Sequence, residues 1–210
     1  MAGPQKFRRP AMLDPGFAAQ IPGGLDPALR DQIAHQTAQA IVQNGRATTD
    51  PQIVDRLIHL VEEEGIETIA GLWADATALS LPGALWRLYA LRLWMQHDTQ
   101  TAVVWYRLGE AAAAVSHAIA GVAEPPTPEH LLQLVDDVLS GVYKGDLAVA
   151  LERAGAYARI LATGMALDAD SRDLVDQKAA SAMTISAANL QRTARELEQA
   201  AKQWRRNALD

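Results

Sequence analysis

The sequence contains no cysteine, and this absence removes two classes of protein. Disulfide-stapled scaffolds and thiolate metal centres both require cysteine, so neither is possible for this chain. Nothing in the composition favours an oxidising compartment, and we predict a cytoplasmic protein. At 210 residues the chain is long enough to bury a core without such staples.

Long apolar runs are also missing. The most apolar stretch, residues 81–106, is interrupted by Arg87, Arg92 and His97. A helix that spans a membrane needs about 20 predominantly apolar residues, so we expect no membrane segment. The segment MAGPQKFRRPAMLDPGF has basic residues without an apolar stretch after them, and we do not expect it to act as a secretory signal.

Positive charge is scarce, since the net charge is −6 and the sequence pI is about 5.3. General nucleic-acid binders usually show the opposite balance. The basic residues that do cluster lie near the two ends of the sequence: Lys6, Arg8 and Arg9, then Lys202, Arg205 and Arg206. We interpret both clusters as solvated segments. Contact with nucleic acid remains an alternative for them.

Proline and glycine are concentrated in residues 1–24, at a density that neither helices nor strands tolerate. We predict a disordered arm there. From residue 25 onward, apolar residues recur at helical spacing and no strand pattern is convincing. The expected helices cover 27–44, 51–64, 66–79, 82–96, 99–122, 128–140, 147–163 and a long last helix from about 171. The sequence therefore predicts an all-α bundle of seven or eight helices, with a core domain at 25–170 and a long C-terminal helix at 171–210.

The long last helix carries a regular apolar seam. Its members alternate spacings of four and three over three heptads: Met183, Ala187, Leu190, Ala194, Leu197, Ala201 and Trp204. This pattern is typical of the a and d positions of a coiled coil. The seam needs a cover, because propensity alone poorly stabilises an isolated helix that exposes Leu190, Leu197 and Trp204. We predict that it docks a partner or a second copy, and the alternative is that it folds back on its own bundle.

Aromatic residues make up only 5% of the chain, yet three of the five tryptophans lie between Ser80 and Tyr106. Two interpretations are open for this aromatic block. Its rings can fill the core where helices cross, because an alanine-rich bundle needs bulky side chains in its wider gaps. They can also line a ligand pocket, for which the candidate residues are Trp86, Arg87, Tyr89, Arg92, Trp94 and Trp105.

Catalytic and metal-binding arrangements are not evident. His59 with Glu62 and Glu63 forms the densest group of potential ligands, but no second helix supplies matching ligands, and we predict no metal site. Ser116 and His117 are adjacent on one predicted helix, so their side chains point about 100° apart and cannot act on each other. We therefore predict no catalytic residues, no cofactor and no enzymatic activity.

The stretch ADATALSLPGALWRLYALRLWMQHDTQTAVVWYRLGE, residues 74–110, resembles a family of helical proteins from high-G+C actinobacteria that share an LPGALWRLY-type block. The likeness covers about residues 50–170. It implies a bacterial cytoplasmic protein, and it carries no activity, catalytic residue or cofactor with it.

From these observations we predict a non-enzymatic interaction or adaptor protein that acts through helix surfaces and self-associates or binds a protein partner. Two alternatives belong to other classes. One is a DNA-associated regulator that uses the basic N-terminal arm and dimeric C-terminal helices. The other is a small-molecule binder that uses the aromatic block as its pocket.

Overall fold

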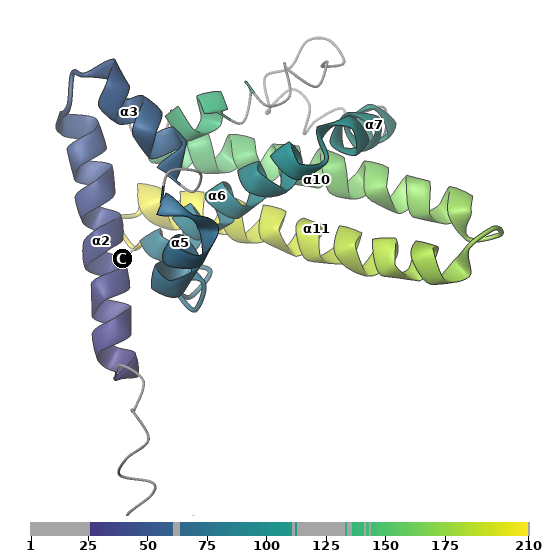
Figure 1. The fold of residues 1–210 in the computed structure, drawn as a ribbon, viewed down its shortest axis with the longest axis horizontal. Helices are drawn as coiled ribbons and strands as arrows, with labels where there is room; N and C mark the ends of the chain where they lie inside the picture. Colours follow the sequence, from purple (N-terminus) through teal and green to yellow (C-terminus); the bar gives the residue numbers. More distant parts are fainter. Residues whose placement is uncertain are drawn as a thin grey trace, which may run out of the picture.

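The computed structural model describes residues 26–60, 64–110, 112, 133, 136–140, 142 and 144–209, and the elements assigned in these ranges are all helices. They are α2 (Pro27–Ala47), α3 (Pro51–Ile58), α5 (Ile66–Trp73), α6 (Leu81–His97), α7 (Thr99–Glu110), α10 (Leu147–Arg172) and α11 (Gln177–Arg205) (Figure 1). The predicted all-α class is confirmed. Three predicted segments lie wholly or mostly outside the described residues: the arm at 1–24, the part of the 99–122 helix that follows residue 110, and the helix at 128–140.

Side-chain caps set the start of most of these helices. Each cap is an oxygen that accepts from a backbone N–H of the first turn: Asp26 from Ala28 at 3.0 Å, Asp50 from Gln52 at 2.9 Å, Ser80 from Gly83 at 3.2 Å, Asp146 from Ala148 at 2.8 Å and Asp176 from Ala179 at 3.0 Å. Pro27 and Pro51 follow their caps directly, where the missing N–H costs nothing. The helix starts predicted at residues 27 and 51 are confirmed.

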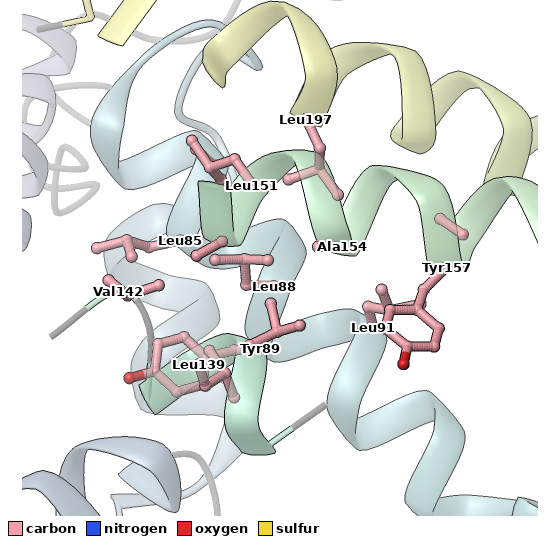
Figure 2. Packing of buried hydrophobic residues seen from close by; sticks show 14 of the residues in the cluster. Leu85, Leu88, Tyr89, Leu91, Leu139, Val142, Leu151, Ala154, Tyr157 and Leu197 are labelled. Carbon is pink, nitrogen blue, oxygen red and sulfur yellow. The ribbon is translucent and has the colours of Figure 1, made fainter. Parts of the chain in front are cut away.

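α6 is the central helix of the core, as expected for a helix with apolar residues on nearly every side. It meets α10, α11 and the side chains of Val138, Leu139 and Val142 around a cluster that Figure 2 shows from close by. The labelled members are Leu85, Leu88, Tyr89, Leu91, Leu139, Val142, Leu151, Ala154, Tyr157 and Leu197. The core therefore joins segments that are distant in the sequence.

A buried aromatic pair ties the N-terminal helices to α6. The rings of Trp73 and Tyr89 lie 6.2 Å apart, centroid to centroid, and both side chains are almost fully buried. Trp73 donates its indole N–H to the Thr37 hydroxyl of α2 at 3.1 Å. The Tyr89 hydroxyl donates to the carbonyl of Leu57 in α3. One ring pair thus fixes α2, α3 and α5 against α6.

The longest elements, α10 and α11, form an antiparallel hairpin (Figure 1). Ion pairs join them, with Arg159 to Glu198 at 2.5 Å and a second pair between Glu152 and Arg205. The predicted boundary between a core domain ending at 170 and a helix starting at 171 falls inside α10. The turn lies at residues 173–176 instead, and α11 belongs to the same core as the other helices.

α10 continues past Gly164, where the sequence predicted that the helix would end. The glycine instead marks a close contact between helices. A Cβ at Gly164 would lie 1.7 Å from the carbonyl oxygen of Trp105 in α7, and one at Gly109 would lie 2.0 Å from the carbonyl oxygen of Ile160. The two glycines therefore let the backbones of α7 and α10 touch. Gly45 was also predicted as a helix end, and it is instead buried inside α2.

The hairpin continues past the main core as an arm, which we define as residues 162–189. α7 crosses the arm near its base, at Gly164. The main core cluster includes residues of α10 up to Leu161 and residues of α11 from Leu190 onward. The buried apolar side chains of the arm are mostly alanines: Ala162, Met165, Ala169, Ala180 and Ala187. The arm is therefore a thin two-helix projection whose interior is closely packed but small (Figure 1).

Candidate functional site

A pocket of about 410 Å³ lies between α6 and α11, at the base of the arm. Its lining consists of Ala74, Trp86, Arg87, Ala90, Leu91, Trp94, Met165, Ser186, Asn189, Leu190 and Thr193. Three of the six residues predicted for a pocket, Trp86, Arg87 and Trp94, are in this lining. We call it the aromatic pocket. Its volume lies within the usual range for small-molecule sites, roughly 300–1,000 Å³.

The two sides of the pocket differ in chemistry. α6 supplies an apolar floor, on which Trp86 and Trp94 are spaced so that both rings share one face of the helix. α11 supplies a polar wall made of Ser186, Asn189 and Thr193. An apolar floor with a few placed polar groups is the usual composition of a binding site.

Arg87, the cation in the pocket lining, is paired with a carboxylate of the same chain. Its Nε donates to a carboxylate oxygen of Glu196 on α11 at 2.6 Å, and a terminal nitrogen donates to the carbonyl of Gly83 at 2.9 Å. Both charged side chains are about three-quarters shielded from solvent. The pair closes one end of the pocket without leaving an unbalanced charge there.

A second, shallower hollow of about 590 Å³ adjoins the pocket along α6. Its lining repeats Trp86, Ala90 and Trp94 and adds Leu93, Gln96 and His97. The floor of the pocket therefore opens toward solvent at the end of α6. Trp94, which is 36% exposed, stands where the two hollows meet.

Trp94 is held by a chain of contacts that reaches the arm. Its ring stacks on that of Trp105 in α7, with centroids 5.8 Å apart and planes 9° from parallel. Trp105 donates its indole N–H to Asp168 of α10 at 2.8 Å, and Arg172 donates to the same carboxylate at 2.9 Å. The hydrogen bond from Arg172 is the main reason that the pKa of Asp168 lies below its ordinary value, and the bond from Trp105 lowers it further. Trp94, on the floor of the pocket, is therefore held in position by contacts that run through Trp105 to Asp168.

The other predicted pocket residues do not line it, and the geometry of α6 gives the reason. Tyr89 and Arg92 lie on the buried side of this helix, away from Trp86 and Trp94. Tyr89 reaches Leu57 as described, and the Nε of Arg92 donates to Asp136 at 2.6 Å. Trp105 contributes from α7 by supporting Trp94 from behind. Part of the aromatic block thus belongs to the core, and part of it, Trp86 and Trp94 with Arg87, lines a pocket.

The seam of the C-terminal helix is covered within the chain. Ala187, Ala194, Leu197 and Ala201 are buried, while Met183, Leu190 and Trp204 are half-buried, and α10 is the helix that packs on α11. A Cβ added at Gly155 would lie 3.0 Å from the carbonyl oxygen of Ala194, so the two backbones approach closely. The four buried residues cannot at the same time form a surface for another molecule, whereas Met183, Leu190 and Trp204 keep part of their surface exposed. The alternative of a helix that folds back on its own bundle describes the seam.

A different apolar surface is open to solvent at the turn of the arm. Leu174 is 98% exposed and Val175 is 89% exposed. Three exposed carboxylates flank them in the sequence, Asp170, Asp173 and Asp176. They outnumber the exposed cations of this stretch, Lys178 and Arg172, of which Arg172 is paired with Asp168. We call the two apolar residues and the three carboxylates the acidic tip.

The opposite end of the hairpin carries the reverse charge. Exposed cations lie near this end of α11, which also carries the half-buried Trp204, and we call the group the basic base: Arg46, Lys202 and Arg206. The guanidinium of Arg46 lies over the Trp204 ring, 5.4 Å from its centroid. Arg205 is also there, paired with Glu152, whose pKa it lowers. About 43 Å of helix separates the two ends, from 29 residues at 1.5 Å each.

Metal-ligating and membrane-spanning features are not found in the described part of the chain. No three His, Asp or Glu side chains gather there as ligands for an ion. His59 contacts the Asp55 carbonyl at 2.9 Å, while Glu62 and Glu63 lie outside the described residues, as do Ser116 and His117. None of the described helices has the length and apolar character to cross a bilayer.

Sequence reasoning missed the polar half of the pocket. Ser186, Asn189 and Thr193 were ordinary surface positions of a predicted seam helix, and no motif marks them. Glu196 gives the one available signal, because it flanks the seam in the sequence, and charged residues that flank a seam commonly make polar contacts to a packed helix. Its partner is Arg87 of the same chain.

Comparison with known proteins adds no relative: no family model, no curated protein and no solved structure matches the chain. The resemblance to an actinobacterial helical family therefore stays a prediction. The class of protein that can be stated is an all-α protein with a projecting two-helix arm and an aromatic pocket at the base of that arm.

Proposed function

We propose that this is a non-enzymatic interaction protein that assembles with further copies of itself through its arm. The observation that carries the proposal is the acidic tip, where Leu174 and Val175 project into solvent beside each other. Fully burying one such side chain stabilises by roughly 1.5–3 kcal/mol. A contact that covers both would therefore contribute substantially to association.

The charges of the hairpin indicate which surface would cover the tip. Two acidic tips repel each other, whereas the basic base offers exposed cations, one of them over the indole of the half-buried Trp204. A tip that contacts the base of another copy thus gains opposite charges and an apolar partner together. We therefore expect a head-to-tail contact.

A head-to-tail contact has a consequence for the size of the assembly. The two surfaces differ, so each copy still has a free tip or a free base after the first contact. Such heterologous contacts form rings if the rotation closes and open chains if it does not. We expect the mean mass to rise with protein concentration and to fall with salt, because screening weakens the charged contact.

The first test removes the apolar part of the tip. The double variant Leu174→Ser with Val175→Ser should sediment as a monomer at concentrations where the wild type forms larger species. The matched control is Val104→Ser with Leu108→Ser, an equally apolar pair on α7 that is 50% and 41% exposed. The control should assemble like the wild type. Monomeric wild-type protein at high concentration would refute self-association.

The second test exchanges the charges. Asp170→Lys with Asp173→Lys reverses the tip, and Lys202→Glu with Arg206→Glu reverses the base. Each variant alone should assemble weakly. An equimolar mixture should regain assembly, since the reversed tip fits the reversed base. If the mixture stays monomeric while the wild type assembles, the contact is not tip to base.

A further inference from the structure

We infer that the aromatic pocket is a binding site for a small uncharged molecule with a flat aromatic body and a hydrogen-bonding edge. This inference concerns a surface distinct from the acidic tip and the basic base. It does not depend on self-association.

The floor of the pocket sets the shape of the ligand. Trp86 and Trp94 present indole faces that are already in place, and Leu91, Met165 and Leu190 complete the apolar lining. Aromatic rings stack on such faces with an offset, at centroid distances of about 4.5–7 Å. Trp94 is stacked on Trp105 from behind, so its ring loses little freedom when a ligand adds to the other side. A volume of about 410 Å³ accepts a molecule of two or three rings.

The wall of the pocket sets the polar edge. The Asn189 side-chain oxygen accepts from Arg192, which leaves the amide NH₂ of Asn189 without a hydrogen bond to any residue that the structure describes. The hydroxyls of Ser186 and Thr193 donate to the carbonyls of Ala182 at 3.0 Å and Asn189 at 3.2 Å, so their oxygens keep acceptor capacity. The wall can therefore both donate to a ligand and accept from it.

Charge decides between a neutral and an ionised ligand. The guanidinium in the pocket lining, that of Arg87, is already bonded to Glu196 and to a backbone carbonyl. Arg192, outside the lining, donates to the Asn189 oxygen, and among the described residues the lining holds no further charged side chain. An ionised ligand would lose hydration without gaining a partner for its charge, which is costly. A neutral molecule meets no such cost.

The test uses two dyes that differ by one charge. N-phenylnaphthylamine is neutral and has two aromatic units joined by an N–H, and anilinonaphthalene sulfonate is the same molecule with a sulfonate added. The full chain should bind the neutral dye saturably, at one site, and at least ~10-fold more tightly than the anionic dye, a difference of about 1.4 kcal/mol. Quenching of tryptophan fluorescence should accompany binding.

A filling variant locates the site. Ala90 lies on the floor and lines both hollows. Ala90→Phe should weaken binding of the neutral dye by ~10-fold or more, since the new ring occupies the space of the ligand. The control is Ala188→Phe, at an exposed position of α11 outside both linings. It should bind like the wild type, with the helical circular dichroism of both variants unchanged.

Three outcomes would overturn the inference. The first is no saturable binding of the neutral dye by the folded wild type. The second is equal binding by Ala90→Phe and wild type, which would place the dye elsewhere. The third is a loss of self-association, but not of dye binding, in Ala90→Phe, which would make the groove a protein contact. If dye binding persists in the tip double variant, the pocket and the arm act separately.

Discussion

Asp168 shows how a single carboxylate can join distant parts of this molecule. It accepts from the Trp105 indole and from Arg172, and its side chain is only 11% exposed. Removing a hydrogen-bond partner from such a site leaves the other groups unsatisfied. The residue therefore sets the position of α7 against the start of the arm, and through Trp105 it also sets the floor of the pocket.

We predict that Asp168→Asn lowers the free energy of unfolding by about 1–3 kcal/mol at neutral pH. The folded state lowers the pKa of Asp168, so its contribution is fully present above the unfolded value of about 3.9. That contribution is lost as the pH falls through the folded pKa. The window of this titration lies at and below the unfolded value of about 3.9. Urea unfolding followed from neutral pH down through that window should show a smaller loss of stability on acidification in the variant. Equal acid sensitivity in both proteins would contradict the assignment.

Asp168 also marks a limit of sequence reasoning at this scale. Trp86, Arg87 and Trp94 could be predicted as pocket residues because bulky rings and cations are conspicuous within a single segment. Asp168, Asn189 and Asp136 could not, because each acquires its role from a partner on another helix. Pairing across helices depends on the packing angle, which spacing within one helix does not contain.

At the scale of the helices, a glycine can end a helix or allow two helices to pack closely, and the sequence alone does not distinguish these roles. Gly164 and Gly45 both looked like helix ends, since glycine commonly follows the last turn of a helix. Both lie inside helices, and at Gly164 the hydrogen replaces a side chain for which there is no room. Helix starts were more predictable, because an Asp-Pro pair acts through local geometry alone.

We predict that Gly164→Ala destabilises the protein although alanine favours the helix by about 1 kcal/mol. The new Cβ would lie 1.7 Å from the Trp105 carbonyl oxygen and 2.5 Å from its carbonyl carbon, so α7 must move away from α10. Overpacking of this kind typically costs about 1–3 kcal/mol, and more where backbone must shift.

The matched control is Gly71→Ala in α5, where no atom lies within 4 Å of the added Cβ. It should leave the thermal midpoint unchanged or raise it. The Gly164 variant should melt earlier and shift the tryptophan emission, because Trp105 moves with α7. A midpoint as high as that of the control would show that the two helices are not in backbone contact.

For the molecule as a whole, the fully buried tryptophan and the tryptophans that line the pocket are different residues. If the whole aromatic block were core, truncating Trp86 or Trp94 would unfold the domain. In the structure Trp73 is completely buried, Trp86 is half-buried and Trp94 is 36% exposed. The seam likewise predicted the correct helix face, but its cover proved to be α10, which heptad spacing cannot identify.

We predict that Trp73→Ala costs about 3–5 kcal/mol, as expected for a fully buried tryptophan. Trp94→Ala should cost about 1–2 kcal/mol, because less apolar surface leaves contact with protein. Chemical denaturation of both variants and the wild type measures the difference. The Trp94 variant should keep the wild-type circular dichroism and bind the neutral dye weakly. Equal destabilisation by the two changes would assign Trp94 to the core.

The alanine interior of the arm has a consequence for how the molecule fluctuates. Alanine buries little surface, so each turn from Leu190 toward residue 176 adds less to local stability than a turn in the core. Segments with few buried apolar contacts open on their own, at a lower free energy than global unfolding. Backbone amides should then exchange with solvent deuterium progressively faster toward the turn, while those of α6 exchange only when the whole chain unfolds. The arm should therefore open gradually from its turn toward the core, while the body of the molecule exchanges slowly.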